Sequence, residues 1–152
     1  MQRHAISMHR RIVAGVLLAG FAAAAQAEIV IEDAWARATP PGFDKGAVYF
    51  ELTNTGTRGD TLVGVSSDRA PRTELHRTIE EGGNSRMVHT PRVTIPAEGE
   101  VIFEPGGRHV MLMGVEEALA EGERFTIELA TEDGGELPVE VQVLAPTAMG
   151  ID

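Results

Sequence analysis

Short runs in which apolar and polar residues alternate recur along the chain, and this pattern limits the fold to one built from strands. The run from Ala47 to Thr53 is clear, with Val48, Phe50 and Leu52 on one face. Alternation with a period of two predicts strands that are buried on one side. We expect strands at Glu28–Ile31, Ala34–Arg37, Ala47–Thr53, Thr61–Ser66, Arg72–Thr78, Ser85–Thr90, Val93–Ile95, Val101–Phe103, His109–Gly114, Phe125–Leu129 and Val139–Val143.

Gly, Pro, Asn and Asp separate these runs, and many short strands divided by such turns indicate an all-β sandwich or barrel. Glu116–Ala120 is the one helix-like piece, for which we expect a single helical turn. We assign residues 28–145 to one domain, a size typical of a single core. Residues 146–152 have no periodicity, and we expect a flexible tail.

The chain begins with a segment that predicts export. Arg3, Arg10 and Arg11 precede an uncharged apolar run, which ends at the small-residue site Ala25-Gln26-Ala27. This is the order of a secretory signal peptide over residues 1–27, cleaved after Ala27. The apolar run is short for a membrane span. We therefore expect an exported protein with no membrane insertion after cleavage.

Charge and cysteine content exclude several classes of function. The formal net charge is −10, and loss of the basic leader makes the rest still more acidic. Nucleic-acid binding requires a basic surface, so we expect no nucleic-acid partner. The chain has no cysteine, which excludes thiolate metal sites. A soft metal would have to be held by His76, His89, His109, Met87, Met111, Met113 or Met149.

The segment Pro105–Gly114 places a histidine and two methionines at alternate positions. In a strand, His109, Met111 and Met113 would share one face, with Val110 and Leu112 on the other. Imidazole and thioether side chains on one face can bind a single copper ion. The simpler interpretation of this segment alone is that the methionines fill the core.

A second His/Met pair lies on an expected hairpin. A turn centred between Glu81 and Gly82 would place His76 directly opposite Met87, within about 4.5–5.5 Å between Cβ atoms. A turn centred between Gly82 and Gly83 would instead place His89 opposite His76, with Met87 on the diagonal. The sequence leaves both registers open. In either register, two His/Met pairs brought together would give four neutral ligands, a set that favours Cu(I).

The full spacing resembles a known family. His76, Met87, His109 and Met111 are separated by ten, twenty-one and one residues. This matches the H-x10-M-x21-H-x-M signature of the periplasmic copper chaperones called PCuAC. The flanking segments match too: residues 46–50, 54–56, 74–76 and 105–114. The resemblance covers nearly all of the chain after the leader.

The resemblance implies a cupredoxin-like Greek-key β-sandwich that binds one Cu(I) through His76, Met87, His109 and Met111. It also implies copper delivery to the CuA site of cytochrome c oxidase, with Sco-type thiol proteins as partners. Met113 matches a methionine that follows the ligands in the family. The resemblance implies that it surrounds the ligands or packs against other side chains. Two features depart from the family: His89 stands near Met87 as a competing ligand, and the tail has Met149 but no His/Met-rich extension.

Several functions could be considered for such a chain, and each makes a different demand on the ligands. A carrier needs a site that a partner can reach, which ligands on an exposed hairpin would provide. A copper redox enzyme would need an open coordination position, and a four-ligand site offers none, so we expect no enzyme activity. Copper sequestration would use the same residues as delivery, so the sequence cannot separate the two. An adhesive sandwich without metal is disfavoured by the matched spacing. We expect a monomer.

Overall fold

The computed structural model describes Gly20 and residues 28–152, and these form ten strands and no helix. The expected leader at residues 1–27 lies outside the described residues apart from Gly20. No helix in the described part of the chain is long and apolar enough to cross a membrane. The strands are β1 (Ile29–Arg37), β2 (Lys45–Asn54), β3 (Asp60–Ser66), β4 (Arg72–Glu81), β5 (Asn84–His89), β6 (Val93–Ile95), β7 (Gly99–Phe103), β8 (Arg108–Met113), β9 (Arg124–Thr131) and β10 (Gly135–Leu144).

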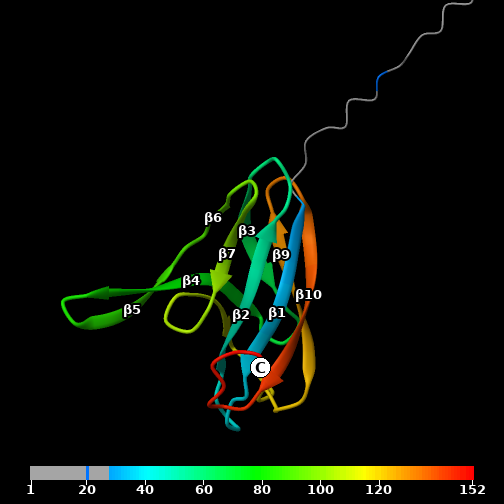
Figure 1. Ribbon diagram of the computed structural model, residues 1–152. Coiled ribbons are helices and arrows are strands. Elements are labelled where there is room, and N and C mark those ends of the chain that lie inside the picture. Colours follow the sequence, from blue (N-terminus) through cyan, green and yellow to red (C-terminus); the bar gives the residue numbers. More distant parts are fainter. Residues whose placement is uncertain (1–19, 21–27) are drawn as a thin grey trace, which may run out of the picture.

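All ten strands are hydrogen-bonded in the order β5-β4-β8-β7-β2-β1-β10-β9-β3-β6, with β8 also pairing with β2. The series folds over on itself (Figure 1), so that β3 contacts β4 and β6 contacts β7, and both halves contribute side chains to one core. The expected all-β, cupredoxin-like Greek-key sandwich is confirmed. Most neighbours are antiparallel, but β1 pairs with β10 in parallel.

The core follows the alternation seen in the sequence. Val48, Phe50 and Leu52 of β2 are fully buried, as are Ile127 and Leu129 of β9. The rings of Phe50 and Phe103 stack with centroids 4.3 Å apart. Because these residues come from both layers, the burial of their apolar surface holds the layers together.

The two predicted N-terminal runs form one strand with a bulge. The register of β1 against β2 shifts between Glu32 and Trp35, and Asp33 adopts a φ of 53° there. A bulge inserts an extra residue and bends the strand. The chain thus bends between the two runs without leaving the sheet.

The β4–β5 hairpin projects from the body of the molecule as an arm (Figure 1). Glu81 pairs with Asn84, which leaves Gly82 and Gly83 as the two-residue turn. Their φ values are 58° and 81°. Two-residue hairpin turns favour positive φ at both positions, which glycine adopts without steric cost. The second of the two predicted registers is therefore the one observed.

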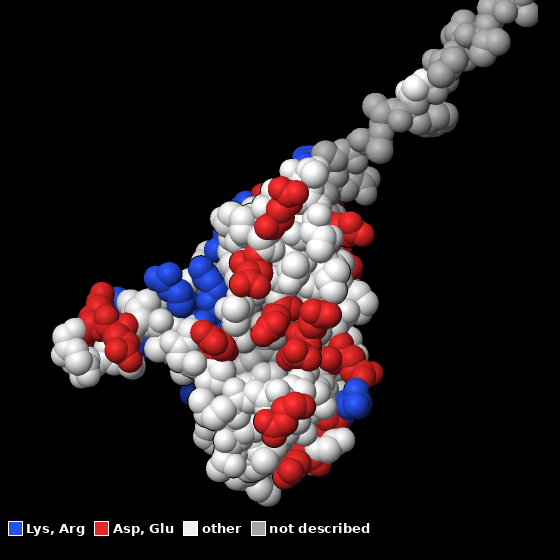
Figure 2. All heavy atoms as spheres, in the orientation of Figure 1, with Lys and Arg blue, Asp and Glu red and all other residues white. Residues whose placement is uncertain are grey.

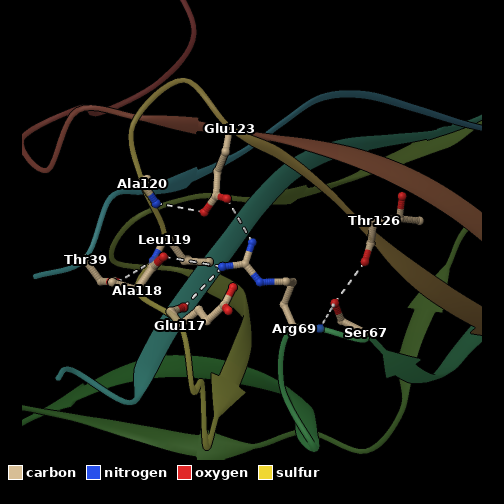
Figure 3. Close-up of polar contacts among 9 residues, drawn as sticks. All are labelled: Thr39, Ser67, Arg69, Glu117, Ala118, Leu119, Ala120, Glu123 and Thr126. Atoms are coloured by element: carbon tan, nitrogen blue, oxygen red, sulfur yellow. Dashed lines mark hydrogen bonds and ion pairs between the residues drawn. The ribbon is translucent and has the colours of Figure 1, made fainter. Parts of the chain in front are cut away.

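The predicted helical turn at Glu116–Ala120 is wrong. The segment is an irregular loop whose backbone groups are bound by side chains from elsewhere, as Figure 3 shows. The Thr39 Oγ1 accepts from the Leu119 amide at 2.9 Å, and Arg69 Nη2 donates to the Glu117 carbonyl at 3.2 Å. Leu119 is fully buried. These tertiary bonds replace the local ones that a helical turn would make.

The C-terminal residues follow β10 along the surface. Arg37 Nε donates to the Ala148 carbonyl at 2.7 Å, and Arg37 Nη2 lies 3.0 Å from the Met149 sulfur. The flexibility expected for residues 146–152 stays a prediction.

Candidate metal centre

Strand β8 presents its residues as the alternation predicts. Val110 and Leu112 are fully buried in the core, while Met111 and Met113 are half-buried on the opposite face. His109 shares that second face but is only 3% exposed. Met111 lies between Ala47 of β2 and Glu74 of β4 in the register of the sheet. The strand is thus anchored by its core face and offers His109 and Met111 from the other.

Three histidines lie side by side across β5, β4 and β8. His76 pairs with His89 on one side and with His109 on the other. The ring centroid of His76 lies 5.8 Å from that of His89 and 5.6 Å from that of His109. We call His89, His76 and His109 the histidine row. Its burial increases from exposed His89 on the edge strand to His109 inside.

The two methionines of the predicted ligand set line one groove. Met87 is the diagonal neighbour of His76 and is 57% exposed. Met87 and Met111 both border a mostly apolar cavity of about 580 Å³, here called the methionine groove. Tyr49 also lines it, and its ring centroid lies 6.5 Å from that of His109. The groove and the histidine row are therefore adjacent. The other residues lining the groove are Arg37, Ala38, Thr39, Pro40, Phe43, Lys45, Gly46, Ala47 and Pro146.

Two buried imidazole nitrogens in the histidine row have no hydrogen-bond partner. Within the described residues, these are Nδ1 of His76 and Nε2 of His109. An unsatisfied buried polar atom costs about 1–3 kcal/mol. A metal ion bound at these nitrogens would offset that cost. The two histidines thus offer free lone pairs on neighbouring strands.

The surroundings of His109 favour its neutral form. Burial lowers the pKa of His109, a hydrogen bond with the backbone of Gly107 raises it, and the nearby His76 lowers it further. The net shift of the pKa is downward, which favours the neutral imidazole. Metal ligation requires neutral imidazole.

Glu74 is the polar residue that the sequence analysis missed. Its Oε2 lies 2.8 Å from Nε2 of His76, and its Oε1 accepts from Nε of Arg72 at 2.9 Å. The hydrogen bonds to His76 and then to Arg72 lower the pKa of the Glu74 carboxyl despite partial burial. The signal was present in the sequence, because Glu74 precedes His76 by two residues and so shares its face.

The chemistry of the donors selects the kind of metal. No group of three or more His, Cys, Asp or Glu among residues 28–152 is arranged to hold a metal ion. The thioethers of Met87 and Met111, which border the adjacent methionine groove, are the further candidate donors. Thioether ligands favour soft ions such as Cu(I).

A family model described as "Putative lipoprotein LpqE-like" matches residues 29–143. The chain belongs to the LpqE-like family. Two curated relatives are similar to this LpqE-like chain. "Putative lipoprotein Lxx21020" of Leifsonia xyli subsp. xyli is 32% identical over 116 residues, covering 76% of this chain and 69% of the relative. "Uncharacterized protein RP573" of Rickettsia prowazekii is 33% identical over 123 residues, covering 78% and 68%.

The fold of this LpqE-like protein is that of solved PCuAC domains. The apo PCuAC domain of PmoF2 superimposes with a TM-score of 0.68 at 28% identity, over 81% of this chain and 94% of that domain. The copper-bound PCuAC domain of PmoF2 gives a TM-score of 0.66 at 27% identity, over 78% and 93%. The solution structure of CuI-DR1885 from Deinococcus radiodurans gives 0.64 at 35% identity, over 82% and 83%. The expected likeness to PCuAC domains is thereby confirmed.

Proposed function

We propose that this protein is an exported copper chaperone that binds one Cu(I) through His76, Met87, His109 and Met111. It acts in the periplasm after cleavage behind Ala27, and it carries copper without catalysing a reaction. Its acceptor is the CuA site of cytochrome c oxidase, with Sco-type thiol proteins as further partners.

One observation carries the proposal most strongly. His76 and His109 are paired across β4 and β8 with unpartnered buried nitrogens. Met87 and Met111 border the adjacent methionine groove. Four residues from β4, β5 and β8 are thereby gathered on one side of the sheet, in a fold shared with a Cu(I)-bound structure.

The unequal exposure of the four proposed ligands suits copper transfer better than copper storage. Met87 is more than half exposed on a projecting hairpin, whereas His109 is buried. A partner can therefore replace the thioether of Met87 first, while His109 still holds the ion. Storage would instead favour a set of ligands that are all enclosed.

An anaerobic Cu(I) titration against a competing chelator tests the binding. We expect one Cu(I) per chain, and an absence of binding at chelator-competitive affinity would contradict the proposal. Delivery is tested by mixing the Cu(I)-loaded protein with a purified apo CuA domain. Transfer faster than from the Cu(I)–chelator complex supports a chaperone, whereas equal rates favour sequestration.

A further inference from the structure

Glu74 fixes one nitrogen of His76 and leaves the other free. Its Oε2 lies 2.8 Å from Nε2, while Nδ1 is buried without a partner among the described residues. An ionised carboxylate only accepts hydrogen bonds, so Nε2 carries the proton in the neutral imidazole. The lone pair is then on Nδ1.

The backbone of Gly107 fixes one nitrogen of His109 and leaves the other free, but the nitrogens are reversed relative to His76. Nε2 of His109 is buried and unpartnered, so the interaction with the Gly107 backbone that raises the pKa of His109 falls on Nδ1. Because the Gly107 carbonyl accepts, the bond uses the Nδ1 proton and leaves the lone pair on Nε2. The Gly107 carbonyl also accepts from the Thr78 amide at 3.0 Å, which fixes it against β4.

We propose that Glu74 is a positioning residue of the copper site, and that Cu(I) binds Nδ1 of His76 and Nε2 of His109. This inference rests on the proposed function and names the ligand atoms within it. Copper can then enter without breaking the bond between Glu74 and His76. A carboxylate on the far nitrogen of a ligating histidine holds the ring in place and increases its basicity.

The assignment separates His89 from its two neighbours. His89 lies opposite His76 but is exposed on the edge strand. No hydrogen bond within the described residues holds its ring in one tautomer. His89 is therefore an internal reference, because its imidazole is expected to populate both tautomers.

Long-range ¹⁵N NMR of the histidine rings tests the assignment directly in the ¹⁵N-labelled protein at pH 8. In the apo state, we expect His76 protonated at Nε2, His109 protonated at Nδ1, and a mixture for His89. On anaerobic addition of one equivalent of Cu(I), the large shifts should fall on His76 Nδ1 and His109 Nε2. Shifts at His76 Nε2 or His109 Nδ1 would overturn the inference. A failure of Cu(I) to bind at all would instead overturn the proposed function.

Variants of Glu74 test the positioning role. Glu74→Ala should give His76 mixed tautomers and weaken Cu(I) binding about 10–100-fold. Glu74→Gln retains an acceptor for Nε2–H and should retain the tautomer. Glu81→Ala is the matched control, because that carboxylate contacts Arg86 and no histidine. Unchanged tautomer and affinity in Glu74→Ala would contradict the role; if that variant does not fold, the wild-type spectrum decides.

Discussion

His76 of β4 and His109 of β8 are directly opposed across the sheet, with ring centroids 5.6 Å apart. Thirty-two intervening residues form the arm, β6 and β7 before the chain returns to this position. The pairing is set by the core, because Leu75 and Val110 lie in the neighbouring register position and are both buried. The geometry of the candidate centre therefore depends on the packing beneath it.

Removing both thioethers should abolish tight Cu(I) binding. In Met87→Ala/Met111→Ala, only imidazole nitrogens remain, and the preference for the soft ion is lost. Chelator competition should show no stoichiometric Cu(I) in this variant. Met149→Ala is the control, because Met149 is 71% exposed and does not line the methionine groove. Retention of one tightly bound Cu(I) by the double variant would contradict the ligand assignment.

The two ends of the histidine row should differ in their effect on copper. His109→Ala removes a proposed ligand, and we expect a loss of Cu(I) affinity of about 100-fold or more, comparable to 2.7 kcal/mol. His89→Ala, at the exposed end of the same row, should change the affinity by less than about threefold. Competition titrations of the two variants give the comparison. Equal losses would mean that His89 also binds the metal.

The strand that carries His109 and Met111 should depend on its buried face. Leu112 is fully buried in the core. Leu112→Ala should lower the free energy of unfolding by about 2–5 kcal/mol, because it removes buried apolar surface and leaves a cavity. Urea denaturation measures the change. Val30→Ala, at a position 43% exposed, should cost much less; a similar loss at both positions would contradict the assigned core.

Stability should fall in acid through Asp60. Burial raises the pKa of this carboxyl, but hydrogen bonds from the amides of Thr61 at 2.7 Å and Asp133 at 3.1 Å outweigh burial, so the pKa lies below its usual 3.8. A carboxyl whose pKa is lower in the folded state than in the unfolded state stabilises the fold at any pH above its unfolded-state pKa. This contribution is lost as the pH falls through the folded-state pKa.

The measurement is urea unfolding as a function of pH below about 4, where the unfolded carboxyl takes up its proton first. Asp60→Asn should be less stable than the wild type at pH 7, and the difference should shrink in acid. A constant difference between the two proteins at every pH would show that the charge of Asp60 has no such role.

Much of the fold could be predicted from local patterns. The alternation around Val48 and around Val110 identified strands and their buried faces, because a half-buried strand requires that period. The register of the arm was not determined, since Gly82 and Gly83 allow more than one turn. The loop at Glu116–Ala120 was misassigned because its backbone partners, Thr39 and Arg69, are far away in the sequence.

The candidate centre was predictable only in part. The spacing of the histidines and methionines singled out four residues, and alternation placed His109 and Met111 on one face. The contact of Glu74 with His76 was not predicted, because it depends on side-chain orientation on β4. Likewise, the burial of His109 depends on its neighbours in β2 and β4, which the sequence of β8 does not specify.

X-ray absorption spectroscopy of the reduced, copper-loaded protein tests the central claim most directly. Two imidazoles and two thioethers on one Cu(I) predict a first shell of two nitrogen and two sulfur atoms. A shell containing only nitrogen and oxygen would contradict the assignment of Met87 and Met111, and with it the proposed copper centre.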